Sequence, residues 1–158
     1  MKRITLPIET ERLVIRALRL EDAGDLRRPT DWIGEKVDRF ERDGGMSLWA
    51  VVERTSGRAV ALAGLQWEQI EGRRELDLGC VVAEDARQLG YATEASVAVL
   101  GAAFSAGFRR ITAMTGADNQ PALRVLAKLE FSRAGETTFD GRRYELFVLE
   151  PQELETVA

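Results

Sequence analysis

Histidine is absent from the 158-residue sequence, and cysteine occurs once, at Cys80. Without histidine there is no Ser-His-Asp or Cys-His triad and none of the usual histidine-containing zinc sites. We therefore expect no metal, and any acid–base chemistry must come from carboxylates, tyrosines, lysines, the thiol or water. A lone cysteine cannot form an internal disulfide, which fits a reducing cytoplasm.

Lysine is also scarce, with only Lys2, Lys36 and Lys128, and the formal net charge is -4. No lysine-rich block exists, which argues against nucleic acid as the main partner, because phosphate binding needs clustered cations. The N-terminus lacks the long apolar core of a signal peptide, and the longest mainly apolar run, 95–104, is too short to span a bilayer. We expect a cytoplasmic protein with no membrane partner.

The length and composition predict one globular domain covering 1–158. Apolar residues make up 45% of the chain and charged residues 30%, an ordinary balance for a soluble domain. No internal repeat, low-complexity tract or linker divides the sequence.

Hydrophobic periodicity and turn residues predict a mixed α/β sheet with helices on its faces. Asp140-Gly141 is a strong hairpin turn signal, and Ser56-Gly57 separates two further strands. The expected strands are 13–18, 47–54, 59–70, 75–83, 110–115, 131–139 and 142–149. The expected helices are 20–26, one or two short helices within 27–45, 91–106 and 119–129.

The segment 81–95 carries the strongest chemical signal. A strand runs into a turn with Gly90 and then directly into a helix. The first amides of a helix lack intrahelical partners and lie at the positive end of its dipole, and the small Gly90 and Ala92 allow close approach to the backbone. The turn is a candidate pyrophosphate cradle, although most strand–glycine–helix junctions only turn the chain.

Several segments resemble the GNAT superfamily of acetyltransferases, and in particular its ribosomal-protein N-terminal acetyltransferase branch. RQLGYA at 87–92 is similar to the superfamily's phosphate-turn signature, and GYATEA at 90–95 to the run found in that branch. NQPALRVLAKLEF at 119–131 resembles the branch's Asn-x-x-Ser helix, and TERLVIR at 10–16 its first strand. The resemblance covers nearly the whole chain in the right order.

This resemblance implies an α/β GNAT-like domain with a mostly antiparallel seven-stranded sheet, splayed at the acyl-CoA site. It implies transfer of an acetyl group from acetyl-CoA to a primary amine by direct attack on the thioester. The acceptor stays open between a protein N-terminus and a small-molecule amine, and the analogy is compatible with a homodimer. The segment 27–45 is expected to form much of the acceptor wall.

The resemblance also assigns cosubstrate-binding residues. Backbone groups at the end of the strand would pair with the pantetheine arm, and amides of the turn would hold the pyrophosphate. Arg87 is either near phosphate or a solvated surface arginine, and Asn119 is a pantetheine ligand, a helix N-cap, or both. The full set is Val81, Val82, Arg87, Gln88, Leu89, Gly90, Tyr91, Ala92, Thr93 and Asn119.

Three positions depart from the family pattern. Gln88 replaces a frequent glycine, which is tolerable if its φ is negative, and Glu130 replaces a helix-ending glycine, where a left-handed conformation costs roughly 1 kcal/mol. Ala122 replaces the branch's serine, thought to protonate the departing thiolate. Ala122 favours an alternative function, an acyl-CoA-binding sensor or assembly module with little turnover.

Asp77 and Glu68 are the candidates for the general base. Asp77 aligns with a strand carboxylate used by some superfamily members, and Glu68 lies late in the preceding strand; each is alternatively a solvated strand residue. Cys80 is interpreted as a buried strand thiol close to the expected acetyl group. The three tryptophans are interpreted as core or cleft wall: Trp32, Trp49 and Trp67.

Overall fold

The computed structural model describes residues 2–151, so the predicted domain of 1–158 extends beyond the described residues at both ends. The helices are α1 (Asp22–Leu26), α2 (Thr30–Arg42), the short 3-10 helix η1 (Glu84–Ala86), α3 (Tyr91–Ser105) and α4 (Gln120–Lys128). The strands are β1 (Ile8–Glu9), β2 (Leu13–Arg16), β3 (Leu48–Glu53), β4 (Ala59–Ile70), β5 (Arg73–Val82), β6 (Ile111–Thr115), β7 (Ser132–Phe139) and β8 (Arg142–Leu149).

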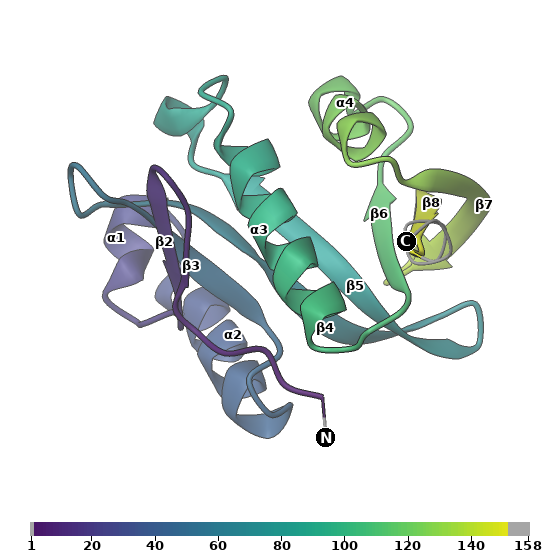
Figure 1. Cartoon of the computed structure of the whole chain (residues 1–158), viewed down its shortest axis with the longest axis horizontal. Coiled ribbons are helices and arrows are strands. Elements are labelled where there is room, and N and C mark those ends of the chain that lie inside the picture. The colour runs from purple at the N-terminus through teal and green to yellow at the C-terminus, as the bar shows by residue number, and fades with distance from the viewer. Residues whose placement is uncertain (1, 152–158) are drawn as a thin grey trace.

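Within residues 2–151 the strands form one sheet in the order β1-β2-β3-β4-β5-β6-β8-β7 (Figure 1). Neighbouring strands are antiparallel except β5 and β6, which are parallel. The mixed α/β class is therefore confirmed, but the described sheet has eight strands where seven were expected. The extra strand, β1, pairs Ile8 with Ile15 and is too short to show an alternating pattern.

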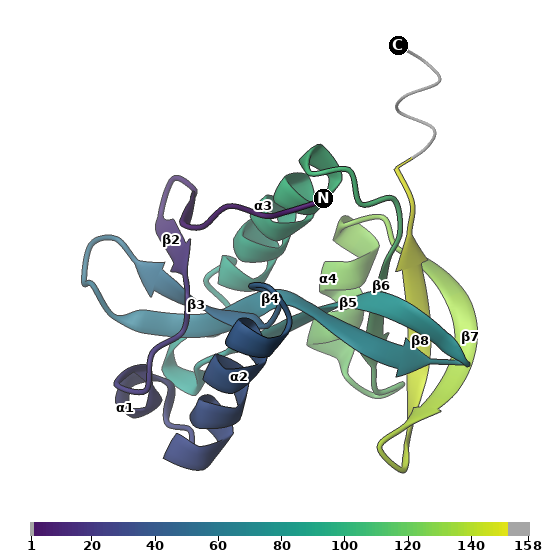
Figure 2. The ribbon, with the colours of Figure 1, turned by 90° about the horizontal axis from the view of Figure 1, so that it is seen from below.

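Helices cover both faces of the sheet, with α3 and α4 on one face and α1 and α2 on the other (Figure 2). Alternation along the strands supplies an apolar surface to each face. On the α3 face, Val99 and Ala103 pack in a core cluster with Leu65 and Leu76. On the opposite face, Ile33 of α2 packs with Leu62 of β4. β4 therefore contributes to a core on each face of the sheet.

Turn chemistry explains the hairpins, and one helix differs from expectation. Asp140 and Gly141 have φ of 49° and 75°, the paired positive values of a tight hairpin turn. The segment 27–45, expected to hold one or two short helices, contains one helix of 13 residues, which is longer than expected. Gly34 does not interrupt α2, and a Cβ built there would approach Leu20 no closer than 3.7 Å. No helix in 2–151 combines the length and apolarity needed to cross a membrane.

Candidate active site

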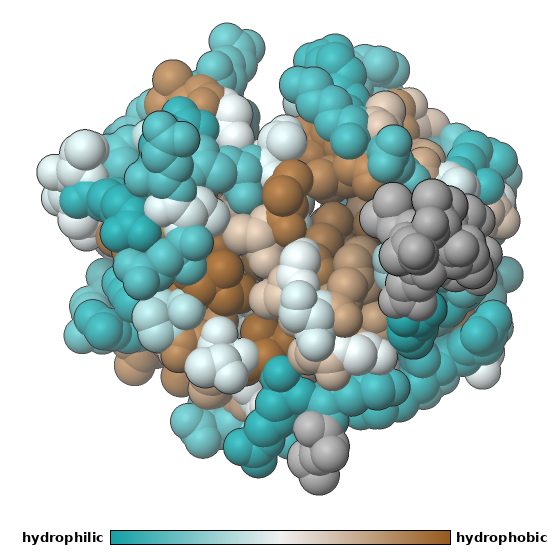
Figure 3. All heavy atoms as spheres, viewed as in Figure 1, coloured by the Kyte–Doolittle hydropathy of each residue, from teal (hydrophilic) through white to brown (hydrophobic). Residues whose placement is uncertain are grey.

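The sheet splits between β5 and β6. In the described chain these strands share one register pair, Asp77 with Thr112, and beyond it β5 continues to Val82 with β4 on one side only. Figure 3 shows the surface hollowed between α3 and α4, with hydrophobic residues lining the hollow and hydrophilic residues on its rim. The split leaves an unpaired strand edge inside this hollow.

The ladder with β4 decides which peptide groups are free at that edge. Ala83 N donates to Val60 O at 2.8 Å, and Val81 lies opposite Leu62. Because successive residues of a strand point their peptide groups to opposite sides, Val81 bonds toward β4, whereas Cys80 and Val82 point toward the split. Of the two predicted pantetheine-pairing residues, Val82 has a free edge and Val81 does not. The sequence analysis missed the Cys80 peptide, because the hydrogen-bond register with β4 determines which β5 peptide groups face the split.

The turn that follows β5 presents the start of α3. Gly90, with φ of 83°, precedes the helix and makes no side-chain cap. The first bond is donated by Glu94 N to Gly90 O at 3.1 Å, so the amides of Tyr91, Ala92 and Thr93 have no intrahelical acceptor. These amides and the helix dipole form a concentrated partial positive charge suited to a phosphate.

Two of the departures from the family pattern adopt strained geometry. Gln88 has φ of 65°, so the negative φ that would have made this substitution comfortable is not present. Glu130 has φ of 67°, as expected of a residue in the place of a helix-ending glycine. Each conformation costs about 1 kcal/mol relative to glycine.

A cavity of about 130 Å³ lies beside the turn and brings together three arginines, Arg27, Arg28 and Arg87. Val81, Val82 and Glu84 also line it. Arg87 Nε donates to Val82 O at 3.5 Å, so this guanidinium reaches the free strand edge. The cavity concentrates positive charge in a chain of net charge -4.

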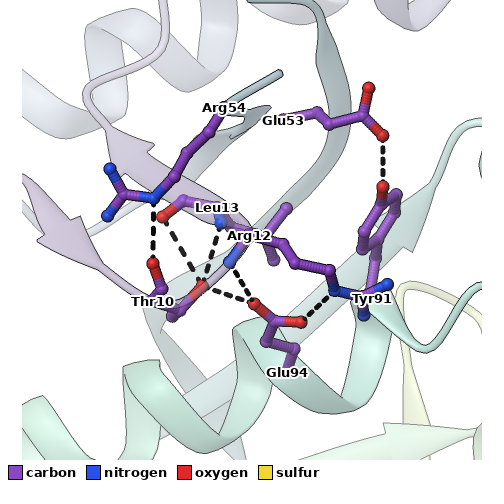
Figure 4. A network of polar contacts seen from close by, with 7 residues as sticks. All are labelled: Thr10, Arg12, Leu13, Glu53, Arg54, Tyr91 and Glu94. Carbon is purple, nitrogen blue, oxygen red and sulfur yellow. Dashed lines mark hydrogen bonds and ion pairs between the residues drawn. The ribbon is translucent and has the colours of Figure 1, made fainter. Parts of the chain in front are cut away.

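A polar network ties the start of α3 to the β1–β2 turn and to β3 (Figure 4). Arg12 Nε donates to Glu94 at 2.7 Å, the Arg12 amide donates to the same carboxylate at 3.0 Å, and Thr10 Oγ1 donates to it at 2.6 Å. The Arg12 guanidinium lies 4.5 Å from the Tyr91 ring, and the Tyr91 hydroxyl donates to Glu53. The network neutralises Glu94, whose charge would otherwise repel an anion at this helix end.

Asp77 lies at the apex of the split. It is 9% exposed, and its Oδ1 accepts a hydrogen bond from Thr112 Oγ1 at 2.7 Å. Burial raises the pKa of Asp77 to about 7, with Thr112 opposing the rise and Glu68 and Glu75 adding to it. A carboxyl that titrates near neutrality can both accept and release a proton at physiological pH.

Glu68 is close to Asp77 but already paired. Asp77 lies opposite Gln66 of β4, and Glu68 is two residues further along β4. Glu68 accepts a hydrogen bond from Arg39 Nη1 of α2 at 2.9 Å. α2 comes from the segment 27–45, which was expected to form much of the acceptor wall, and its Lys36 also donates to Gln66 at 3.4 Å. Glu68 further lines a hollow of about 500 Å³ between the β4–β5 and β7–β8 turns.

Cys80 is half-buried, and burial raises the pKa of its thiol to about 11. At neutral pH the group is a protonated thiol and a poor nucleophile.

Asn119 caps α4 through Oδ1, which accepts from Ala122 N at 3.2 Å. The capping role is confirmed, and within residues 2–151 the side-chain nitrogen of Asn119 has no hydrogen-bond partner. Ala122 lies in the first turn of α4 with no hydroxyl to offer.

One of the three tryptophans lies in the core, and the other two are half-buried. Trp49 is 1% exposed and donates to Gly45 O at 2.9 Å, which makes it a core residue. Trp32 and Trp67 are half-buried and lie beneath cations, Lys36 and Arg74 respectively.

Comparison with known proteins identifies relatives. The family model described as an acetyltransferase (GNAT) domain matches residues 12–132. The uncharacterised protein YkkB of Bacillus subtilis is 28% identical over 106 residues, covering 66% of this chain and 61% of that protein, so the chain spans less than two thirds of this curated relative.

Solved structures share the fold. RimJ of Mycobacterium smegmatis, in complex with CoA-disulfide, is 21% identical with a TM-score of 0.73, covering 90% of this chain and 83% of that one. The ribosomal-protein-S5-alanine acetyltransferase of Vibrio fischeri is 15% identical with a TM-score of 0.73, covering 92% and 97%.

Proposed function

Because the chain belongs to the acetyltransferase (GNAT) family, we propose that residues 1–158 act as one domain that transfers an acetyl group from acetyl-CoA to a primary amine. The observation that carries the proposal is the position of Asp77. A buried carboxyl with a pKa of about 7 lies where the sheet splits, at the inner end of a free strand edge. Such a group is matched to the deprotonation of an amine near neutral pH.

The donor side is proposed to use the free edge and the turn. Peptide groups of Cys80 and Val82 would pair with the pantetheine arm as an added strand does. The amides of Tyr91, Ala92 and Thr93 would hold the pyrophosphate, with Arg87 beside them. The charges of Arg27 and Arg28 across the 130 Å³ cavity support an anionic ligand there.

The reaction we propose is direct attack. The amine nitrogen bonds to the thioester carbonyl carbon while its proton passes to Asp77, and the C–S bond breaks with its electron pair on the CoA sulfur. The thiolate then takes a proton from water, because Ala122 has none to give. Free peptide N–H groups at the strand edge are suited to polarise the carbonyl oxygen. The high pKa of Cys80 argues against a covalent acyl-cysteine step.

The acceptor is proposed to be an α-amine of a protein N-terminus or a small-molecule amine of lowered pKa. An α-amino group with a pKa of about 8 is roughly one-tenth neutral at pH 7, whereas a lysine of pKa about 10.4 is almost fully charged. A site with one carboxyl and no leaving-group acid suits the amine that is easier to deprotonate.

An acceptor screen that follows CoA release tests this proposal. Asp77→Asn should lower turnover by roughly 10²-fold or more with acetyl-CoA affinity nearly unchanged, because the carboxylate serves the acceptor. Glu68→Gln is the matched control on the neighbouring strand and should retain more activity. Tight acetyl-CoA binding with no CoA release from any amine would favour the sensor that Ala122 suggests. Parental turnover in Asp77→Asn would place the base elsewhere.

A further inference from the structure

Thr112 lies directly opposite Asp77, on the strand across the split. Thr112 is fully buried and Asp77 is 9% exposed, and the two form the register pair that joins β5 to β6. The Thr112 hydroxyl donates to Asp77 Oδ1 at 2.7 Å. The last point of contact between the strands is thus reinforced by a side-chain bond from one to the other.

This bond makes the two carboxylate oxygens of Asp77 unequal. Oδ1 is occupied by Thr112, whereas Oδ2 has no hydrogen-bond or ion-pair partner within residues 2–151. Oδ2 is also not among the described side-chain atoms that are both sealed from solvent and unpartnered. It therefore keeps some exposure to solvent.

We propose that Thr112 is a positioning residue that fixes Asp77 through Oδ1 and leaves Oδ2 as the proton acceptor. The inference rests on the proposed function, since it concerns the same carboxyl. Fixing one oxygen removes rotational freedom of the carboxylate before the amine arrives, which is the advantage of preorganisation. It also holds the ionised form at a pKa compatible with neutral pH.

The charges around Asp77 show why the hydroxyl matters. On β4, Glu68 faces it and is paired with Arg39 of α2; on its own strand, Glu75 is paired with Arg110 at 3.0 Å. Lys36 of α2 is directed to Gln66, the residue opposite Asp77. Burial, Glu68 and Glu75 raise the pKa of Asp77, and the Thr112 hydrogen bond lowers it. Loss of the hydroxyl should therefore raise the pKa further.

The test compares Thr112→Val and Thr112→Ala, which lack the hydroxyl, with Thr112→Ser, which keeps it. We expect the hydroxyl-free variants to lose roughly tenfold in kcat at pH 7, the scale of a hydrogen bond to a charged group. The acidic limb of their pH–rate profile should move to higher pH while KM for acetyl-CoA stays unchanged. Thr112→Ser should restore the parental profile. A merely structural threonine would lower activity at all pH values without moving the limb.

A second readout does not depend on turnover. Carboxyl ¹³C NMR, with the Asp77 signal assigned by its loss in Asp77→Asn, should report a higher Asp77 pKa in Thr112→Val or Thr112→Ala than in the parent. An unchanged titration together with an unchanged pH limb overturns the inference. If Asp77→Asn is slow but the hydroxyl-free variants keep the parental profile, only the role of Thr112 fails. If Asp77→Asn is fully active, the proposed base fails with it.

Discussion

Replacing Asp77 by asparagine should stabilise the fold while it slows the enzyme. The native pKa of Asp77 rises from an ordinary 3.8 to about 7, so the fold favours the protonated carboxyl. Its stabilising contribution is complete below pH 3.8, is lost progressively as the pH rises toward 7, and is absent above 7. At 1.36 kcal/mol per pH unit the full effect is about 4 kcal/mol. Asparagine carries no charge to desolvate, and its Oδ1 can still accept from Thr112.

Urea unfolding of the parent and Asp77→Asn between pH 4 and pH 8 measures this effect. The two should have similar free energies of unfolding near pH 4, and the variant should be more stable by up to about 4 kcal/mol at pH 8. In a thermal scan the difference corresponds to a melting temperature higher by roughly 10 °C.

Asp22→Asn is a control of opposite sign. Burial alone would raise the pKa of Asp22, but the hydrogen bonds from the Arg16 guanidinium, at 2.8 and 2.9 Å, and from the Arg19 amide, together with the charges of both arginines, outweigh it and lower the pKa. This variant should lose stability at neutral pH and lose less as the pH falls. An Asp77→Asn protein that is no more stable than the parent at pH 8, or whose advantage is the same at every pH, would refute the assignment of a buried, raised-pKa carboxyl.

Two further outcomes concern the donor side. Acetyl-CoA at a hundredfold excess over its dissociation constant should stabilise the parent by about 2.7 kcal/mol, measured as a shift in a thermal scan. Gly90→Val should abolish that shift, because it forces a β-branched residue to the φ of 83°. Normal CoA binding by this variant would mean that the turn is misassigned. Asn119→Asp should keep the cap on Ala122 N and the melting temperature of the protein without CoA. Its CoA affinity in calorimetry should fall, because the side-chain N–H donor is lost and a carboxylate faces the anionic CoA. Unchanged affinity would leave Asn119 as a cap only.

Local signals in the sequence predicted most of the framework. The turn residues Ser56-Gly57 and Asp140-Gly141 located strands that the structure reproduces, with β4 and β8 starting and ending as expected. The segment 27–45 was harder to predict, because a glycine inside a helix is tolerated when tertiary packing of the apolar face compensates. The two-residue β1 has no periodicity to detect.

The candidate site was predictable only where it depends on neighbours in sequence. Gly90 precedes α3 and Asn119 caps α4 through contacts with nearby residues, so sequence patterns could identify both positions. Asp77 could be nominated, but its raised pKa depends on burial and on Thr112, 35 positions away. Likewise the pairing of Glu68 with Arg39 depends on where α2 packs. Contacts between distant elements have no signature in a single sequence.

The free edge of β5 has a consequence for how the protein can evolve. The groups proposed to bind the cosubstrate there are the peptide N–H and C=O of Cys80 and Val82, which every amino acid except proline supplies in full. Substitutions along this edge therefore leave main-chain recognition in place, provided that the register with β4 is kept. The opposite holds on the α2 face, where Lys36, Arg39 and Glu68 act through their side chains. If the acceptor binds against α2, as expected of the segment 27–45, single substitutions there would change acceptor preference without altering the donor edge.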